Sequence, residues 1–180
     1  ARFAALGALP LALTQGPGET LDVRAFVLIA APLIGRWAMV YAVTRYPYAR
    51  ASGVGAPFRG SDGTVVNGAR RLALATLLTA TLGLLVTLLA LLASILRLEP
   101  HGVTLAVTPD VGGVVLAGIL LLAGLWLIGT LITLGWSYWA ARRLGGGLTG
   151  DTYGALNELV ELGVLVCATP LAIRLVHGVG

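Results

Sequence analysis

The residues with the clearest chemical potential lie between Gly145 and Glu161, where a glycine-rich run leads into a helix that opens with an acid. Residues seven apart return to nearly the same helical face, so Asp151 and Glu158 share a stripe with small residues between them. Carboxylates beside an open helix start could bind a divalent metal, and the free backbone N–H groups could bind phosphate oxygens. An acidic N-cap at a membrane surface explains the same residues, and the spacing does not decide between the two.

Arg36 is a second candidate because it lies near the middle of a long apolar stretch. A charge at the bilayer centre costs at least about 2.5–3.5 kcal/mol, so its guanidinium should face the bundle interior or a wet cavity. Three interpretations stay open. Arg36 is a phosphate or metal-site clamp, it pairs with Glu158 or Glu161, or the span starts later and the side chain snorkels to the interface.

A third cluster begins with Arg45–Arg50, read as Arg-Tyr-Pro-Tyr-Ala-Arg, and continues through several glycines to Arg59. Guanidinium groups, aromatic faces and glycine-rich backbone are typical of a nucleotide or phosphate surface. A basic cytoplasmic loop with an aromatic belt explains the composition as well, and composition alone favours this simpler interpretation.

The elements that must position these residues are membrane spans. The chain of 180 residues is 57% hydrophobic and 11% charged, which is too apolar for a soluble domain of this size. We predict an all-α, polytopic transmembrane helical bundle that forms one integral membrane domain over residues 1–180. It should have about four full spans, at Ala25–Tyr46, Leu72–Leu96, Val114–Ala140 and Leu156–Val176, and one partial N-terminal span at Ala1–Leu13.

Charge sets the predicted orientation. The loop from Pro47 to Arg71 carries four arginines and one aspartate, and Arg142 and Arg143 follow the third span. The other two loops are slightly acidic, so the positive-inside rule places both basic segments in the cytoplasm, where we expect them to meet over one anionic ligand. The net charge of +4 is modest and does not indicate nucleic acid, and the single cysteine, Cys167, excludes a disulfide within the chain.

Three groups of segments resemble the cobalamin synthase family, the adenosylcobinamide-GDP ribazoletransferases. They are Ala31–Met39, then Tyr46–Arg50 with Gly53–Gly55, and Gly147–Asp151 with Gly154–Glu158. Their order and spacing resemble the C-terminal two-thirds of the family over most of residues 31–161. The resemblance implies a multi-pass enzyme of the bacterial inner membrane that joins adenosylcobinamide-GDP to α-ribazole or its 5′-phosphate and releases GMP, late in cobalamin biosynthesis.

The resemblance also implies Mg²⁺ dependence and a set of site residues. Asp151 and Glu158 would act in catalysis, by binding the metal or orienting the nucleophile. The substrate and its phosphates would meet Arg36, Arg45, Arg50, Gly147, Thr149, Gly150 and Asn157. The family's Asp-rich motif from its N-terminal third is absent here, so we expect a fragment that lacks that region and doubt that it is active alone.

Two functions compete with this one. A non-catalytic membrane scaffold or transporter subunit would use Arg36, Glu158 and Glu161 to line a pathway or to pair structurally. A lipid phosphotransferase of the CDP-alcohol type would also lie in the membrane and use a bound metal, but it needs a groove for a lipid acceptor. Membrane lipid surrounds the chain in every case, and self-association into a homo-oligomer stays open.

Overall fold

The computed structural model describes residues 13–14, 20–21, 23–49, 65, 67–99, 102–105 and 111–178. Over these residues the chain is a bundle of helices, each long and apolar enough to cross a membrane. The helices are α2 (Val23–Arg45), α3 (Gly68–Ile95), α4 (Val111–Arg143) and α5 (Gly150–Gly178). The predicted all-α transmembrane bundle is therefore confirmed, and its four full spans match the predicted ones to within a few residues at most ends.

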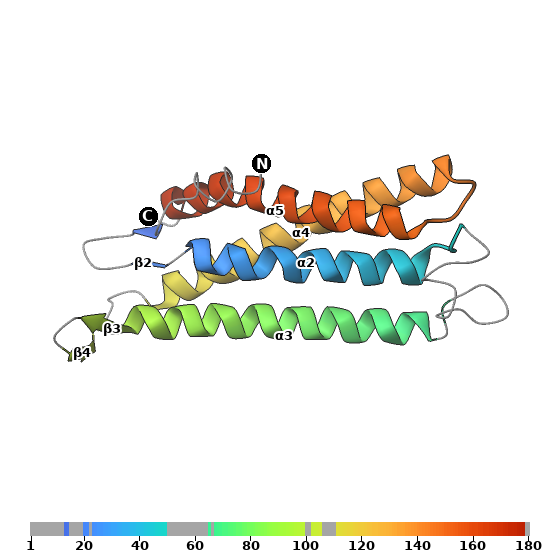
Figure 1. Ribbon diagram of the computed structural model, residues 1–180. Helices are drawn as coiled ribbons and strands as arrows, with labels where there is room; N and C mark the ends of the chain where they lie inside the picture. The colour runs from blue at the N-terminus through green and yellow to red at the C-terminus, as the bar shows by residue number, and fades with distance from the viewer. Residues whose placement is uncertain are drawn as a thin grey trace.

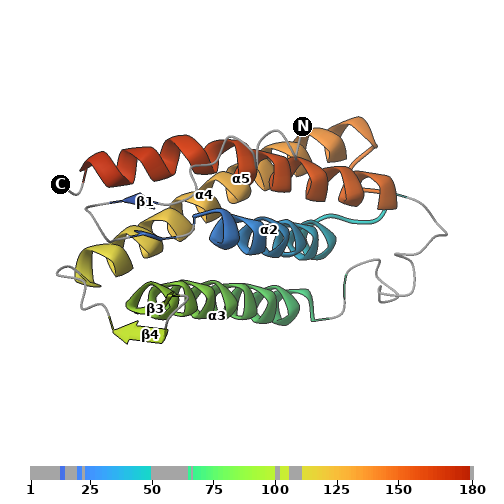
Figure 2. The same ribbon diagram turned by 60° about the vertical axis from the view of Figure 1, so that its left-hand side comes forward.

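Helix α2 is the centre of the bundle. Figure 1 shows α2 lying between α5 and α3, with α4 crossing behind them, and Figure 2 shows the same layers from another side. Helix α2 packs against each of the other three helices, and α4 packs closely along α5. The largest fully buried side chains of these spans come from α2, α4 and α5, among them Phe26, Ile34, Leu121, Leu125 and Val160.

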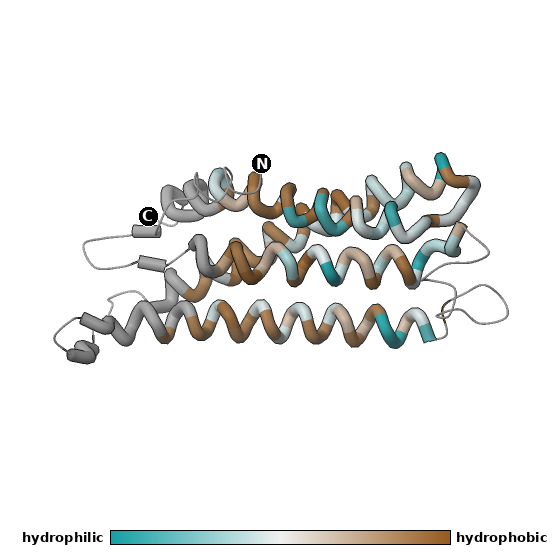
Figure 3. Tube along the Cα trace, in the orientation of Figure 1, coloured by the Kyte–Doolittle hydropathy of each residue, from teal (hydrophilic) through white to brown (hydrophobic). Residues whose placement is uncertain are grey.

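Helix α3 lies at the edge of the bundle and turns most of its surface outward. Leu77 and Leu78 are 63% and 61% exposed. Leu127 and Leu131 of α4 are exposed to a similar degree. In Figure 3 the middle of α3 is largely hydrophobic, and hydrophilic residues gather where α2 ends and α3 begins. Apolar side chains on the outside are stable when the surrounding solvent is lipid, so the exposed surface agrees with the predicted membrane location.

A side-chain hydrogen bond links α3 to the centre of the bundle. The indole Nε1 of Trp37 donates to Oγ1 of Thr76 at 2.9 Å, and the Trp37 ring packs edge-on against Trp126 with centroids 5.6 Å apart. The hydroxyl of Thr76 also donates to the Leu72 carbonyl of its own helix. The Thr76 hydroxyl therefore accepts a hydrogen bond from α2 and donates one within α3.

Thr76→Val keeps the side-chain shape and removes this link. We expect the free energy of unfolding in mixed micelles to fall by about 1 kcal/mol, since an interhelical hydrogen bond contributes that much in a membrane. Thr79→Val is the matched control, because the Thr79 hydroxyl donates to the Ala75 carbonyl within α3. Equal losses in the two variants would contradict a stabilising role for the Trp37 link.

Short strands form at two places that we predicted as loops or helix ends. Strand β1 (Leu13–Thr14) pairs antiparallel with β2 (Thr20–Leu21), and β3 (Leu96–Glu99) pairs with β4 (Gly102–Leu105). The partial span predicted at Ala1–Leu13 lies outside the described residues except for Leu13, which is in a strand and not in a helix. Antiparallel pairing satisfies backbone groups just beyond the helices, and these pairs are too short to give a periodic signal.

Candidate functional site

Two segments far apart in the sequence meet at the end of the bundle where α2 ends and α5 begins. Tyr48 and Leu148 form a parallel bridge. The backbone N–H of Ala49 donates to the Leu148 carbonyl at 2.8 Å, and the N–H of Leu148 donates to the Pro47 carbonyl at 2.8 Å. We call Pro47–Ala49 and Gly147–Thr149 the loop junction. The prediction that these two segments lie at the same end of the bundle is confirmed.

Three consecutive glycines shape the α4–α5 side of the junction. Gly145 and Gly146 have φ values of 76° and 100°, a left-handed conformation that ends α4 and that side chains disfavour. The N–H of Gly146 donates to the Ala141 carbonyl at 2.7 Å, which satisfies an acceptor left free at the helix end. At Gly147 a Cβ atom would lie 2.7 Å from the Pro47 carbonyl oxygen, so only glycine allows the two segments to approach this closely.

The start of α5 is held from both sides. The Thr152 hydroxyl accepts a hydrogen bond from the Thr149 N–H at 2.8 Å and donates to the Thr149 carbonyl at 2.7 Å. Nε1 of Trp136, on α4, donates to the Thr152 carbonyl at 3.3 Å. The prediction of a helix that opens with an acid is confirmed, because α5 begins at Gly150 with Asp151 in its first turn and Thr149 buried just before it. Sequence reasoning missed Thr152 and Trp136, although a hydroxyl three residues after a threonine is a recognisable capping pattern.

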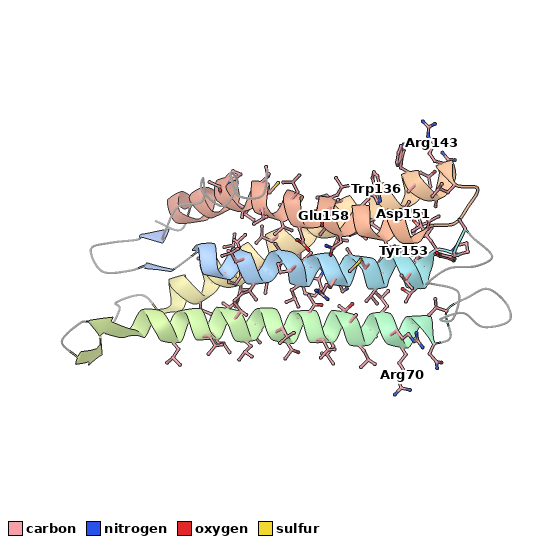
Figure 4. The ribbon with its side chains drawn as sticks, viewed as in Figure 1. Arg70, Trp136, Arg143, Asp151, Tyr153 and Glu158 are labelled. Atoms are coloured by element: carbon pink, nitrogen blue, oxygen red, sulfur yellow. The ribbon has the colours of Figure 1, made fainter. Side chains whose placement is uncertain are left out.

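Asp151 and Glu158 lie on the exposed stripe that the sequence predicted. Both are exposed, and a Cβ added to Gly154 between them would meet nothing within 4 Å. Figure 4 shows Asp151 at the junction end of the bundle and Glu158 further from that end. Seven residues of helix separate them by about 10 Å along the axis.

This separation bears on the predicted metal site. Mg²⁺ binds oxygen at about 2.0–2.1 Å, so two ligands of one ion lie within roughly 4 Å of each other. Asp151 and Glu158 would therefore share one ion only with both side chains extended toward each other, and their predicted metal-binding role stays a prediction. The part of the chain that the structure describes contains no group of three or more histidine, cysteine, aspartate or glutamate side chains that could hold a metal. These residues do not form a complete magnesium site.

Asn157 lies between α5 and α2. Its Nδ2 donates to Oε1 of Glu161 at 2.7 Å, and a Cβ on Gly35 of α2 would lie 2.7 Å from Asn157 Oδ1. That Oδ1 atom is buried and has no hydrogen-bond partner among the described residues. Asn157 therefore contributes to helix packing, and its predicted role in substrate binding stays a prediction.

The candidate arginines separate into two places. Arg45 is exposed at the end of α2, beside the junction. Arg36 lines a groove between α2 and α3 together with Arg71, whereas Gly35 is the residue that faces Asn157 on α5. Arg50 lies outside the described residues.

Exposed arginines and aromatic rings surround the junction end. The guanidinium of Arg142 lies 4.9 Å from the ring centroid of Tyr138, and that of Arg143 lies 5.8 Å from Trp139. Figure 4 shows Arg143 and Arg70 projecting from this same end of the bundle. Burial raises the pKa of the Tyr46 hydroxyl further above neutrality, so this phenol adds no negative charge to the end. The end is therefore strongly positive, as a phosphate-binding surface at a membrane interface requires.

Comparison with known proteins agrees with this arrangement. The family model for cobalamin-5-phosphate synthase matches residues 1–169. The chain is 38% identical to an adenosylcobinamide-GDP ribazoletransferase of Desulforamulus reducens over 140 residues, which is 76% of this chain and 40% of the relative. It is 33% identical over 175 residues to the protein of the same name in Roseiflexus sp., covering 93% of this chain and 51% of the relative.

A shorter match reaches 53% identity over 49 residues, with the Deinococcus radiodurans protein of that name. No solved structure matches the chain significantly. The chain spans about half or less of the length of these curated relatives. Because the family model covers nearly all of it, the chain belongs to the cobalamin-5-phosphate synthase family.

Proposed function

We propose that this chain is part of an adenosylcobinamide-GDP ribazoletransferase. The enzyme joins adenosylcobinamide-GDP to α-ribazole, or to its 5′-phosphate, and releases GMP. The observation that carries the proposal is the loop junction, where two family motifs separated by about a hundred residues pair through their backbones. The family membership and the printed names of the relatives support it.

The residues at the junction suit phosphoryl transfer. The N-terminus of α5, which is the positive end of its helix dipole, lies at the junction. Arg45, Arg142 and Arg143 add positive charge around it. Reactions at a diphosphate depend more on positioning and on charge neutralisation than on covalent catalysis by the protein. We infer that these groups attract the GDP-bearing substrate and stabilise the negative charge on the departing GMP.

Asp151 is the described acid that lies nearest the start of α5, in its first turn. In this proposal it orients the attacking hydroxyl of ribazole, and Glu158 continues the same stripe about two turns further on. Gly150 and Gly154 leave the stripe open, since a Cβ at either position would meet nothing within 4 Å. A bulky corrinoid substrate needs this free surface.

Magnesium stays part of the proposal because the family resemblance implies it. When bound, Mg²⁺ would neutralise charge on the diphosphate oxygens. Asp151 and Glu158 are the described carboxylates that would hold it, and its other ligands would come from phosphate oxygens, water or parts of the enzyme beyond these residues.

Asp151→Asn and Glu158→Gln, each made in the full-length enzyme, test the site assignment. We expect GMP release to fall by about 10²–10⁴-fold in Asp151→Asn, the range for loss of a positioned acid or base. GMP release should fall less in Glu158→Gln, because Glu158 lies further from the junction. Glu161→Gln is the control, because an amide there can still accept the Asn157 hydrogen bond.

Unchanged activity and unchanged Mg²⁺ dependence in both variants would remove these two residues from the site. A scaffold or transporter subunit would show no GMP release in the unmodified full-length protein, whatever its substitutions. The assay therefore separates a wrong site from a wrong function.

We also propose that the junction end faces the cytoplasm of a bacterial cell. Arg45, Arg70, Arg142 and Arg143 all lie at this end, and the positive-inside rule assigns such an end to the cytoplasmic side. In a Cys167→Ser background, a cysteine at Ala49 should resist a membrane-impermeant thiol reagent in intact cells and react after lysis. Reaction in intact cells would show that the junction end faces the outside, which would contradict the proposed orientation.

A further inference from the structure

A groove with a volume of about 640 Å³ lies between α2 and α3, on the side of α2 away from the α5 contact. Its walls are mainly aliphatic and include Val40, Val43, Leu74 and Leu78. The volume falls within the range of about 300–1,000 Å³ that is typical of ligand sites. None of the junction residues lines this groove among those described, so its contents need not be the substrate.

Two arginines line the same groove. Arg71 is in the first turn of α3, at the end of the bundle where the other arginines gather. Arg36 is nine residues before the end of α2, which places its backbone about 14 Å deeper along that helix. The described residues of the lining include no aspartate or glutamate.

This combination favours an anion. Both arginines are exposed. Arg36 lies at membrane depth, where a guanidinium group without a counter-charge is costly, and Arg71 adds a second positive charge to the same groove. The groove that contains Arg36 extends to Arg71 at the end of the bundle, so a side chain of Arg36 that extends toward this interface would approach Arg71. A phosphate group held between them would neutralise both and accept paired N–H bonds from each planar guanidinium.

The lining also limits what carries the phosphate. Leu74 and Leu78 are 49% and 61% exposed on a helix that faces lipid, so the groove is open sideways to the bilayer. Its described lining residues offer aliphatic surface and no aromatic ring on which a base or corrin could stack. We propose that the groove binds an anionic phospholipid, with its phosphate between Arg36 and Arg71 and an acyl chain along Val40, Val43, Leu74 and Leu78.

Such a lipid would fasten α3 to α2. Helix α3 contributes few buried side chains to the core, and its described polar link to α2 is the bond between Trp37 and Thr76. A phospholipid with its head group on Arg71 and its chain against both helices would fill the space between them. Binding should therefore raise the stability of the folded chain.

The test uses the purified full-length protein, stripped of lipid in detergent and titrated with phosphatidylglycerol or with phosphatidylcholine of the same acyl chains. Native mass spectrometry counts the bound lipid, and thermal unfolding reports stabilisation. We expect phosphatidylglycerol to bind at least tenfold more tightly. Arg71→Gln and Arg36→Gln should each weaken its binding about tenfold, as loss of one charged hydrogen-bonding partner predicts.

Arg70→Gln is the matched control. It removes the same charge from the same turn of α3 at an exposed residue that does not line the groove, so binding should be unchanged. Val43→Phe is the second variant, which fills the groove and keeps both arginines, and it should also reduce binding. If Arg36→Gln fails to fold, Val43→Phe and Arg71→Gln still test the proposal.

Three outcomes would overturn the proposal. Equal binding of the two lipids would show that the charge of the lipid head group does not contribute to binding. An equal loss in Arg70→Gln would show diffuse attraction to the basic end of the bundle. Equal stabilisation by inorganic phosphate, in a separate titration without lipid, would identify a site for free phosphate that needs no acyl chain.

Discussion

Gly147→Val should separate the two halves of the loop junction and reduce GMP release by the full-length enzyme by about 10²-fold or more, since a misplacement of about 1 Å is enough for a loss of this size. A Cβ at this residue would lie 2.7 Å from the Pro47 carbonyl oxygen, 2.9 Å from the Ala49 nitrogen and 3.0 Å from the Ala49 Cα. The carbonyl oxygen and the nitrogen also make the two hydrogen bonds of the junction, so relief of the clash breaks the pairing.

The matched control is Gly154→Val, on the exposed face of α5 where an added Cβ meets nothing within 4 Å. Its valine is no worse a helix former than glycine and meets no steric conflict, so α5 should keep its stability. Because Gly154 borders the proposed substrate stripe, the comparison uses thermal unfolding and protease protection of the loop junction as its readouts. If Gly147→Val retains both protection and activity, the junction does not position the site.

Gly129→Val should destabilise the bundle strongly, by about 1–3 kcal/mol or more, because it overpacks a filled core. Gly129 is buried where α2, α4 and α5 meet. An added Cβ would collide with Cγ2 of Ile34 and lie 3.4 Å from Cγ1 of Val160, both in the fully buried core. Small residues allow helices in a membrane to approach closely, and this glycine provides that approach for three of them.

Gly135→Val is the control on the same helix, because a Cβ at Gly135 would meet nothing within 4 Å. Both variants change helix propensity equally, so the difference in unfolding free energy between them measures the steric contribution. Equal stabilities in a mixed-micelle titration would show that the three helices separate easily at Gly129. That result would contradict the close packing described for the core.

The spans and the junction could be predicted from the sequence because each depends on a local or strongly constrained signal. Long apolar runs indicate spans by length alone, and the arginines after Tyr46 and after Ala140 place two loops at one end. The prediction that the loops after Tyr46 and after Ala140 lie at the same end needed no contact information. An even number of spans between two loops returns them to the same surface.

Which residues lie together in the candidate site could not be predicted, because this depends on the direction in which each helix face points. These spans are apolar almost all round, so periodicity could not show that Gly35 faces α5 while Arg36 faces α3. The sequence therefore grouped Arg36 with Asp151 and Glu158, and it gave no sign of Arg71 as a partner. Asp151 and Glu158 both lie exposed on α5, as the shared stripe predicted, and their role in binding a metal stays a prediction because spacing on one face does not fix where the two carboxylates point.

The bridge between Tyr48 and Leu148 also sets an order of events during biogenesis. A ribosome must complete α3, α4 and the first turns of α5 before the partner of Tyr48 has left the exit tunnel. Until then the chain emerging after α2 has no docking site for its backbone, however well its first helices have inserted. A nascent chain arrested before Gly147 should therefore leave Pro47–Ala49 open to protease, and one released after α5 should protect it.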